Sequence, residues 1–448
     1  MALRTSGPAA AARGEGVPGS PRAWVIVGML VILMGLNYAD KLAFGLAANP
    51  VIEEFGLTAT EYGFANSIFY VPFFIATLAV GFYANRAPAT RLLGVIAVLW
   101  GVAQISMVFA AGLGMILFSR LLLGGSEGPT YGLVNHAAFK WLREADRSLA
   151  SSLLSAGGSL GVLIGAPVLT WLIVEHGWRA AFLGSGLASI AWCAVWLLIG
   201  REGPLTGATG AEEAKRSGPG AGAAGPERAA ASGAEPGFWQ IVRTPTFIAV
   251  SLAAFAANWG ISVKLAFMPL YVQNVLGLTE HQTSLYLMAS QLFTVLCVYI
   301  GLAFLIKALM GRGVSSRGAR GVLGGVCLLA AGVSLFGFVL LPLVPLKLGV
   351  SILGALGLIA FPVGSTVIGQ IAPTGKRAGV LGAYAAVYGI AGVIGPLVTG
   401  LFADAGATQA AGLDTGLMFW GGLTLVCGTV AVVFTRPERD ARRLAAGR

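Results

Sequence analysis

The stretch GVLGGVCLLAAGVSLFGFVLL, residues 321–341, decides the fold class of this chain. It carries no charged residue and is apolar on every face, whether it is considered with the period of a helix or that of a strand. A run of about 20 apolar residues is long enough to cross a bilayer as a helix. The alternating segments of about 9 to 11 residues that build a transmembrane β-barrel are absent from the sequence. The stretch therefore predicts a helical membrane protein.

The remainder of the chain repeats this pattern. Hydrophobic residues make up 56% of the sequence and charged residues 11%, and the mean hydropathy is +0.80, which excludes an ordinary soluble domain. We expect an all-α integral membrane protein with twelve transmembrane helices in two six-helix halves. The expected spans are 24–47, 61–83, 92–112, 114–140, 148–173, 179–200, 245–274, 282–307, 321–344, 346–371, 378–402 and 414–435.

The basic residues predict the orientation. If the amino terminus is cytoplasmic, 24 of the 29 Lys and Arg residues fall in the tails and loops of the cytoplasmic side. Only Arg179 and Lys347 fall on the other side, and three lie within the spans. Short cytoplasmic loops collect basic residues, so we expect a multi-pass protein of the inner (plasma) membrane with both termini cytoplasmic. This asymmetry accounts for the net charge of +10 without any nucleic-acid partner.

A long polar segment divides the chain. Residues 201–237 are rich in Ala, Gly, Pro, Glu and Arg and contain too few apolar residues to form a core. We expect five parts: a disordered cytoplasmic tail (1–22), an N-terminal bundle (23–200), a mobile cytoplasmic linker (201–243), a C-terminal bundle (244–436) and a second cytoplasmic tail (437–448). Two six-helix halves joined in this way are typical of transporters that bind their substrate between the halves.

Five ionisable residues interrupt the apolar spans: Asp40, Lys41, Arg120, Glu127 and Lys264. A charge at the centre of a bilayer costs about 2.5 to 3.5 kcal/mol even on lenient scales, so such residues usually act on a solute or a proton. Arg120 and Glu127 are seven residues apart, which places them on one face of a helix and about 10 Å apart along its axis. We expect the first and fourth helices to pack together, so that all four charges of these helices form one network.

Several motifs resemble those of a known family. The segment from Gly81 to Arg91 resembles the loop signature that follows the second helix in the major facilitator superfamily, although Asn85 stands where that superfamily usually has Asp. Glycine-rich, proline-ended residues 157–167 and the triplet at 177–179 are also similar to that superfamily. Residues 120–129 and 37–41 are similar to the Arg and Glu-Gly motif and to the Asp-Arg pair of its anion:cation symporters, with Lys41 where Arg is common.

The resemblance implies a fold, an activity and a set of residues. It implies a symporter that imports an organic anion with protons by alternating access, with a conformational loop that contains Gly81, Asn85, Arg86 and Arg91.

The charges of the first and fourth helices suggest a coupling mechanism. An anion that engages Lys41 or Arg120 weakens their attraction for Glu127 and Asp40, and carboxylates left unpaired in an apolar site take up protons. The alternative interpretation is that the four charges are a static brace between helices.

Further polar and aromatic residues are candidates for binding the substrate: Tyr70, Asn258, Gln291, Tyr384, Tyr388 and Lys264. The eleventh predicted helix lacks the Asn residues found in members that bind sugar acids, so we predict a carboxylate with few hydroxyl groups, either aromatic or short-chain. Two alternatives stay open. Lys264 faces the cavity or extends toward the membrane surface, and the two tyrosines at 384 and 388 bind substrate or only pack.

Three other functions fit these residues less well. A proton-coupled multidrug exporter of the same superfamily binds cations or neutral solutes through carboxylates, whereas three buried cations against two buried carboxylates favour an anion here. An organophosphate/phosphate exchanger requires a bidentate arginine from each half, and Lys264 lacks that geometry. An enzyme or receptor is disfavoured because neither a metal-ligand cluster nor a catalytic set is present. We therefore expect no cofactor, no metal and a monomer in the bilayer.

Overall fold

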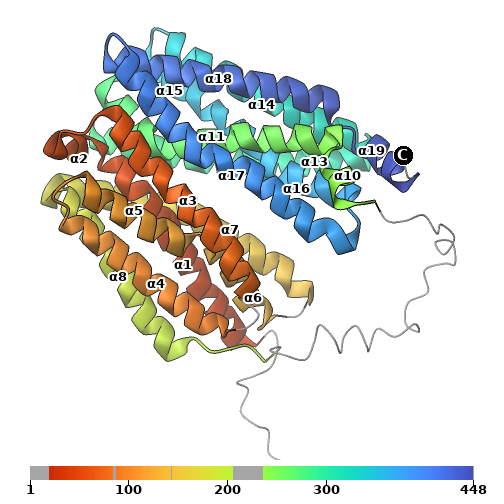
Figure 1. Ribbon diagram of the computed structural model, residues 1–448, viewed down its shortest axis with the longest axis horizontal. Helices are drawn as coiled ribbons and strands as arrows, with labels where there is room; N and C mark the ends of the chain where they lie inside the picture. The colour runs from red at the N-terminus through yellow and green to blue at the C-terminus, as the bar shows by residue number, and fades with distance from the viewer. Residues whose placement is uncertain (1–19, 84–86, 143, 205–235, 447–448) are drawn as a thin grey trace, which may run out of the picture.

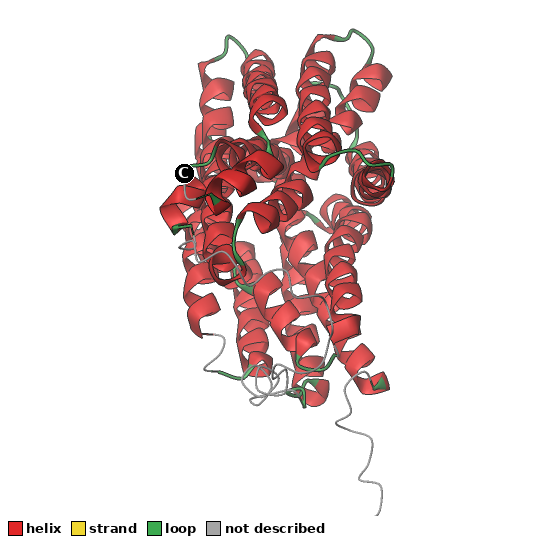
Figure 2. Ribbon diagram, turned by 90° about the vertical axis from the view of Figure 1, so that its right-hand side faces the viewer, coloured by secondary structure: helices red, strands yellow, loops and turns green. Residues whose placement is uncertain are grey.

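The computed structural model describes residues 20–83, 87–142, 144–204 and 236–446. Throughout these residues the chain forms helices joined by short loops, with no strand (Figure 2). The all-helical membrane fold predicted from the sequence is confirmed.

The first half contains eight helices, several of which are segments of one span. Their bounds are α1 Pro21–Leu46, α2 Ala48–Phe55, α3 Ala59–Tyr83, α4 Ala89–Val108, α5 Leu113–Glu127, α6 Thr130–Phe139, α7 Glu144–His176 and α8 Trp178–Ile199. In the second half the α-helices are α10 Phe238–Val242, α11 Pro245–Asn274, α12 Glu280–Phe293, α13 Leu302–Gly311, α14 Leu323–Leu340, α15 Val344–Leu353, α16 Ala360–Ile371, α17 Thr374–Ala405, α18 Gln409–Phe434 and α19 Pro437–Ala445. Three short segments of non-α helix complete its spans: π-helices η1 Thr294–Gly301 and η2 Arg317–Val322, and the 3₁₀-helix η3 Gly354–Ile359.

Ten stretches of the described residues are long and apolar enough to cross a membrane. The other two predicted spans correspond to α3 and to the pair α5 and α6. We predicted the fourth span, 114–140, as one helix, but α5 ends at Glu127 and α6 begins at Thr130. Pro129 between them has no N–H group with which to continue the helical hydrogen-bond pattern. This break places Glu127 on the last turn of α5.

Three short helices lie in regions that were predicted as loop, linker or tail. The first is α2, which follows α1 directly, and the second is α10, within the predicted linker 201–243. The third is α19, in the predicted tail 437–448. Its Asp440 accepts a hydrogen bond from the Thr246 N–H on the first turn of α11. Hydropathy alone misses such helices because they do not cross the membrane. The central part of the predicted linker, 205–235, lies outside the described residues.

The two halves form separate bundles, with α1 to α8 in one and α10 to α19 in the other (Figure 1). We call the end at which α1 begins and α19 ends the linker end, and the opposite end, which carries α2, the far end. In Figure 1 the bundles meet near α2 and lie apart toward α6 and α16. Consistent with this, side chains of α6 and α7 near the linker end are exposed, including Tyr131 and Leu149.

A seam between α3 and α17 joins the halves from the far end to the middle of the molecule. Along this seam Gly400 packs on the backbone of Ala59, Pro396 packs on Gly63, and Gly392 packs on the ring of Tyr70. Each of these glycines faces an atom of the other half where a side chain would not fit. The seam therefore depends on close approach of the two backbones.

Candidate transport site

Two glycines position the charged residues of α5. A side-chain carbon at Gly124 or at Gly128 would collide with the backbone carbonyl of Phe69 or of Phe73 on α3. Because only glycine permits this contact, α5 and α3 lie with their backbones almost touching. Arg120 lies one turn before Gly124, Glu127 lies between the two glycines, and both charged side chains are buried.

An ion pair joins α1 to α5. The ammonium nitrogen Nζ of Lys41 lies 3.1 Å from Oε2 of Glu127, and it also donates a hydrogen bond of 2.6 Å to Oδ1 of Asn37. The side chain of Lys41 is 15% exposed, whereas that of Glu127 is fully buried. The cation of the pair is therefore reachable from solvent, and the carboxylate lies behind it.

Arg120 is held by aromatic rings. Its guanidinium carbon lies 4.7 Å from the centre of the Phe44 ring and 4.9 Å from that of the Phe69 ring. Cations are attracted to the faces of aromatic rings, and more strongly when water is excluded. No ion pair joins Arg120 to Asp40 among the described residues. Within the predicted four-charge network, the ion pair found is the one between Lys41 and Glu127.

Asp40, on α1, points into the interior of the first half. Its side chain is fully buried and faces Gln104 of α4 and Ser185 of α8, but neither makes a well-formed hydrogen bond to its carboxyl oxygens. A buried ionised carboxylate without such partners is costly, whereas the neutral acid is tolerated. Asp40 and Glu127 are close enough to repel each other when both are charged.

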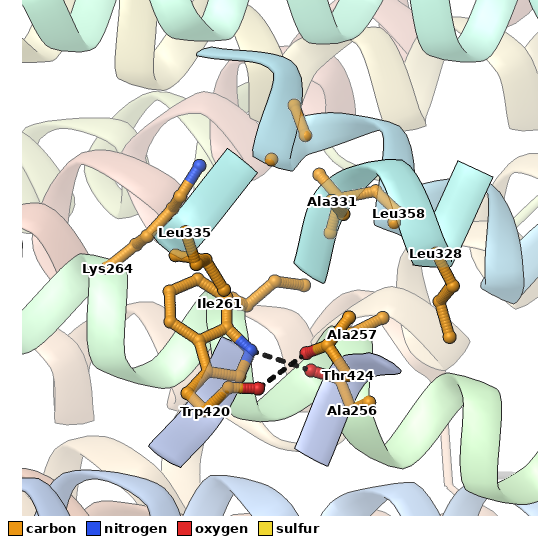
Figure 3. A pocket seen from close by; sticks show the side chains of 14 residues that line it. Ala256, Ala257, Ile261, Lys264, Leu328, Ala331, Leu335, Leu358, Trp420 and Thr424 are labelled. Atoms are coloured by element: carbon orange, nitrogen blue, oxygen red, sulfur yellow. Dashed lines mark hydrogen bonds between the residues drawn. The ribbon is translucent and has the colours of Figure 1, made fainter. Parts of the chain in front are cut away.

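Lys264 lines a cavity of about 50 Å³ that lies inside the second half (Figure 3). The cavity is lined by α11, α14, η3 and α18, and its walls are almost wholly apolar. Thr424 and Trp420 make hydrogen bonds within the wall, to Trp420 O and Ala256 O. Lys264 therefore lines a small cavity inside the second half, and its binding of the substrate stays a prediction. No ion pair is found for it among the described residues.

The remaining substrate candidates are distributed around the contact between the halves. Tyr70 packs on Gly392 of α17, and Gln291 of α12 donates a hydrogen bond of 3.0 Å to Ser159 of α7. Asn258 donates to the carbonyl of Tyr388. Tyr384 is buried, and its hydroxyl donates to a carbonyl of α16, while its ring contacts that of Tyr388. These contacts already use the polar groups of Asn258 and Tyr384, so substrate binding by either requires that they exchange partners.

The predicted conformational loop lies partly outside the described residues. Asn85 and Arg86 lie outside the described residues. Gly81 lies in the last turn of α3, and Arg91 is exposed in the first turn of α4.

Sequence reasoning did not select several residues that shape the site. Asn37 and Tyr38 both contact the ammonium group of Lys41, the latter through its ring at 4.8 Å. Their positions, four and three residues before Lys41, place them on the same helical face, and this spacing was the available signal. Phe44 and Phe69, which flank Arg120, had no such signal because they are two of 23 phenylalanines.

Comparison with known proteins identifies the family. Residues 30–352 match the family model of the Major Facilitator Superfamily. The chain belongs to this superfamily. This confirms the resemblance predicted from the loop after the second span and from the glycine-rich fifth span.

Similar proteins are named as anion transporters. A chloroplastic sodium-dependent phosphate transport protein 1 of Arabidopsis thaliana is 26% identical over 306 residues, which is 68% of this chain and 58% of the relative. A probable sulfoacetate transporter of Cupriavidus necator is 25% identical over 262 residues, 58% of this chain and 60% of the relative. The chain thus spans less than two thirds of the length of these relatives. The names support the resemblance to anion:cation symporters.

A solved structure shows the same fold. A bacterial homologue of the human lysosomal transporter Spinster superposes with a TM-score of 0.76 and covers 94% of this chain and 99% of its own, at 18% identity. At this identity the likeness establishes the fold alone.

Proposed function

We propose that this chain is a proton-coupled symporter that imports an organic carboxylate, aromatic or short-chain, by alternating access. The observation that carries the proposal is the asymmetric pair of Lys41 and Glu127, in which the cation is partly exposed and the acid is fully buried. Relatives named as transporters of phosphate and sulfoacetate support an anionic substrate.

The pair suggests how an anion and a proton are coupled. A carboxylate that approaches Lys41 from solvent competes with Glu127 for the same ammonium group. Glu127 is then left in an apolar surrounding, where the neutral form is favoured, and it binds a proton. Because coupling between two ligands is reciprocal, proton binding to Glu127 strengthens anion binding to Lys41 by the same factor.

The neighbouring groups have distinct roles in this proposal. Arg120, between two rings, supplies a fixed positive charge that attracts the anion without becoming neutral. Asp40 is a second proton-binding group. The body of the substrate contacts five further side chains, those of Tyr70, Asn258, Gln291, Tyr384 and Tyr388. A substrate with few hydroxyl groups suits the rings that surround Lys41, which include those of Tyr38 and Phe73.

The proposal also fixes an orientation. Basic loops and both termini are assigned to the cytoplasm, which makes the linker end cytoplasmic and the far end extracytoplasmic. The bundles that move are 23–200 and 244–436, joined by 201–243. With the seam closed at the far end, the conformation described above is then the one that opens to the cytoplasm.

The test uses purified protein in liposomes that contain a pH-sensitive dye. Small carboxylates, inorganic phosphate and sulfoacetate are added outside, with or without a sodium gradient, and internal acidification is recorded. We expect one class of carboxylate to drive proton entry in the wild type and in Glu53→Gln, a matched change at an exposed position. We expect Glu127→Gln to abolish proton entry.

Two results would contradict the proposal. Proton entry that persists in Glu127→Gln would remove this residue from the coupling. Transport that requires sodium and moves no protons would replace the proton symporter with a sodium-coupled one, and proton counterflow driven by a lipophilic cation would favour an exporter.

A further inference from the structure

The far-end turn of α3 is capped from two directions. The first four N–H groups of a helix have no partner within the helix. In α3 two of these are satisfied locally, because Thr58 N–H donates to Glu61 Oε2 at 2.9 Å and Glu61 N–H donates to Thr58 Oγ1 at 3.1 Å. This reciprocal pair is a capping box within the first half of the protein.

The other two N–H groups are satisfied by the opposite half. Ala59 N–H donates to Oδ1 of Asp404 at 3.0 Å, and Thr60 N–H donates to Oδ2 of the same carboxylate at 2.7 Å. Asp404 lies on the last turn of α17, more than 340 residues away in the chain. One carboxylate of the second half therefore completes the cap of a helix in the first half.

The position of Asp404 on α17 is set by the seam. Gly400 lies one turn earlier on the same face of α17 and packs on the backbone of Ala59. A side chain at Gly400 would hold α17 away from α3, so the glycine permits the approach that brings Asp404 to the helix end. Further along, Ser67 of α3 accepts a hydrogen bond of 3.0 Å from Leu397 N–H. The cap is thus the outermost contact of a continuous seam.

We propose that Asp404 is a latch that stabilises the conformation in which the far end is closed. In an alternating-access cycle the far end opens when α3 and α17 separate. The capping box of Thr58 and Glu61 moves with α3 and is kept in both conformations. The bonds to Asp404 are lost on opening, together with the attraction between its negative charge and the positive end of the helix dipole. Of the two caps on the first turn of α3, only the one made by Asp404 therefore differs between the two conformations.

A second contact at the far end belongs to the same closed state. Asn49 of α2 donates from its side chain to Gln273 at 2.7 Å and to Asn274 at 2.9 Å, both of α11. These are neutral amide contacts between exposed or half-buried groups, and water replaces them readily on opening. The charged cap on a helix end is the stronger of the two, so the latch is assigned to Asp404.

Because one cap of α3 comes from its own half and the other from the opposite half, two variants can be compared. Asp404→Asn removes the charge and one of the two acceptors, whereas Glu61→Gln weakens the same helix end from within the first half. From the typical contribution of a cap and of a charge near a helix end, we expect the first change to raise the ratio of far-end-open to far-end-closed molecules about fivefold. We expect Glu61→Gln to leave that ratio within about twofold of the wild type, because its cap is present in both states.

The experiment measures this ratio by single-molecule fluorescence energy transfer in nanodiscs, without substrate. Dyes are attached at Glu53→Cys on α2 and His281→Cys on α12, in a background that carries Cys297→Ser to remove the exposed cysteine. Asp404→Ser, which keeps one neutral acceptor, is the second variant if Asp404→Asn does not purify as a monodisperse protein. The measurement does not depend on the substrate or on proton coupling, so it is independent of the proposed function.

An unchanged ratio in Asp404→Asn or Asp404→Ser would overturn the latch. A shift of equal size in Glu61→Gln would also overturn it, since this would show that the stability of α3, and not its bond to the other half, controls the opening.

Discussion

The pair of Lys41 and Glu127 makes a prediction about stability that can be tested before any substrate is known. At 3.1 Å and an effective dielectric constant of about 20, the attraction between the two charges is about 5 kcal/mol. Removal of one partner from a buried pair typically costs about 3 to 5 kcal/mol, because the other charge is left without compensation. Removal of both leaves no unpaired charge. Lys41→Met and Glu127→Gln should therefore be strongly non-additive.

The assay is thermal unfolding of purified protein in detergent at pH 8, followed by the loss of monomer. Each single change should lower the melting temperature by roughly 10 °C for a half of this size. The double variant should recover about 2 to 3 kcal/mol relative to the sum of the single changes.

Lys307→Met serves as the control, since Lys307 is exposed on α13. It should leave the melting temperature within about 1 °C of the wild type. Additive effects of the two single changes at the pair would refute the argument. They would show that Lys41 and Glu127 do not stabilise each other despite their short separation, and the coupling mechanism would lose its basis.

Three further predictions concern other parts of the molecule. Gly124→Val should both lower the melting temperature and abolish transport, because the new side chain collides with the carbonyl of Phe69 and displaces the charged residues of α5. A folded variant that transports at the wild-type rate would contradict this prediction. Lys264→Met should raise the melting temperature, because it removes an unpaired charge from an apolar cavity, and a lower value would indicate a partner for this lysine. Hydrogen bonds from Arg179, and from a neighbouring tryptophan, lower the pKa of Glu54 below its ordinary value of 4.5. The stabilisation that Glu54 provides is therefore present above about pH 4.5 and is lost as the pH falls through the lowered pKa, so the melting temperatures of wild type and Glu54→Gln should converge in acid; a constant gap would contradict this.

The sequence predicted the spans well where hydropathy and local signals agree. The bounds of α11 were predicted as 245–274, and the structure gives Pro245–Asn274. The hydroxyl oxygen of Thr244 caps its first turn by accepting a hydrogen bond from Phe247 N–H, and Pro245 occupies the first position, where proline is favoured. The break between α5 and α6 was missed although Pro129 is visible in the sequence, because hydropathy averages over a span and does not respond to a lost N–H group.

The candidate site was predicted less completely, and the reason lies in packing. The charged residues of α1 and α5 stood out because charge is rare in apolar spans. Which charges pair depends on the rotation of each helix, and this is set by distant glycines such as Gly124. Arg120 was expected to pair with a carboxylate but is held by rings, and nothing in the local sequence marks Phe44 or Phe69 for that role.

The position of Lys264 was undetermined for a related reason. The helix α11 is apolar on nearly all sides and largely buried, so its sequence gives no polar face from which the direction of one side chain can be inferred.

Helix α1 carries residues of the site and also contacts α11 of the second half, so the site is physically connected to the contact between the halves. Gly45 lies one turn after Lys41 and packs on the backbone of Leu265 in the second half. Between them, the ring of Phe44 contacts the guanidinium of Arg120 and stacks on Tyr62 at 5.1 Å. The hydroxyl of Tyr62 lies 2.9 Å from the carbonyl of Ala266, again in the second half.

A change of partner at Lys41 or Arg120 therefore shifts the one turn of α1 that also forms the contact between the halves. If an anion draws Lys41 from Glu127, the turn that holds Phe44 and Gly45 can no longer keep both its packing on Arg120 and its fit against α11. Because packed backbones have few alternative arrangements, such a change favours a discrete repositioning of the halves over a gradual one. In the proposed cycle, the bonds of Asp404 add to the free energy that this repositioning requires at the far end, and the exchange of partners at Lys41 and Glu127 contributes to the free energy that the substrate and the proton provide.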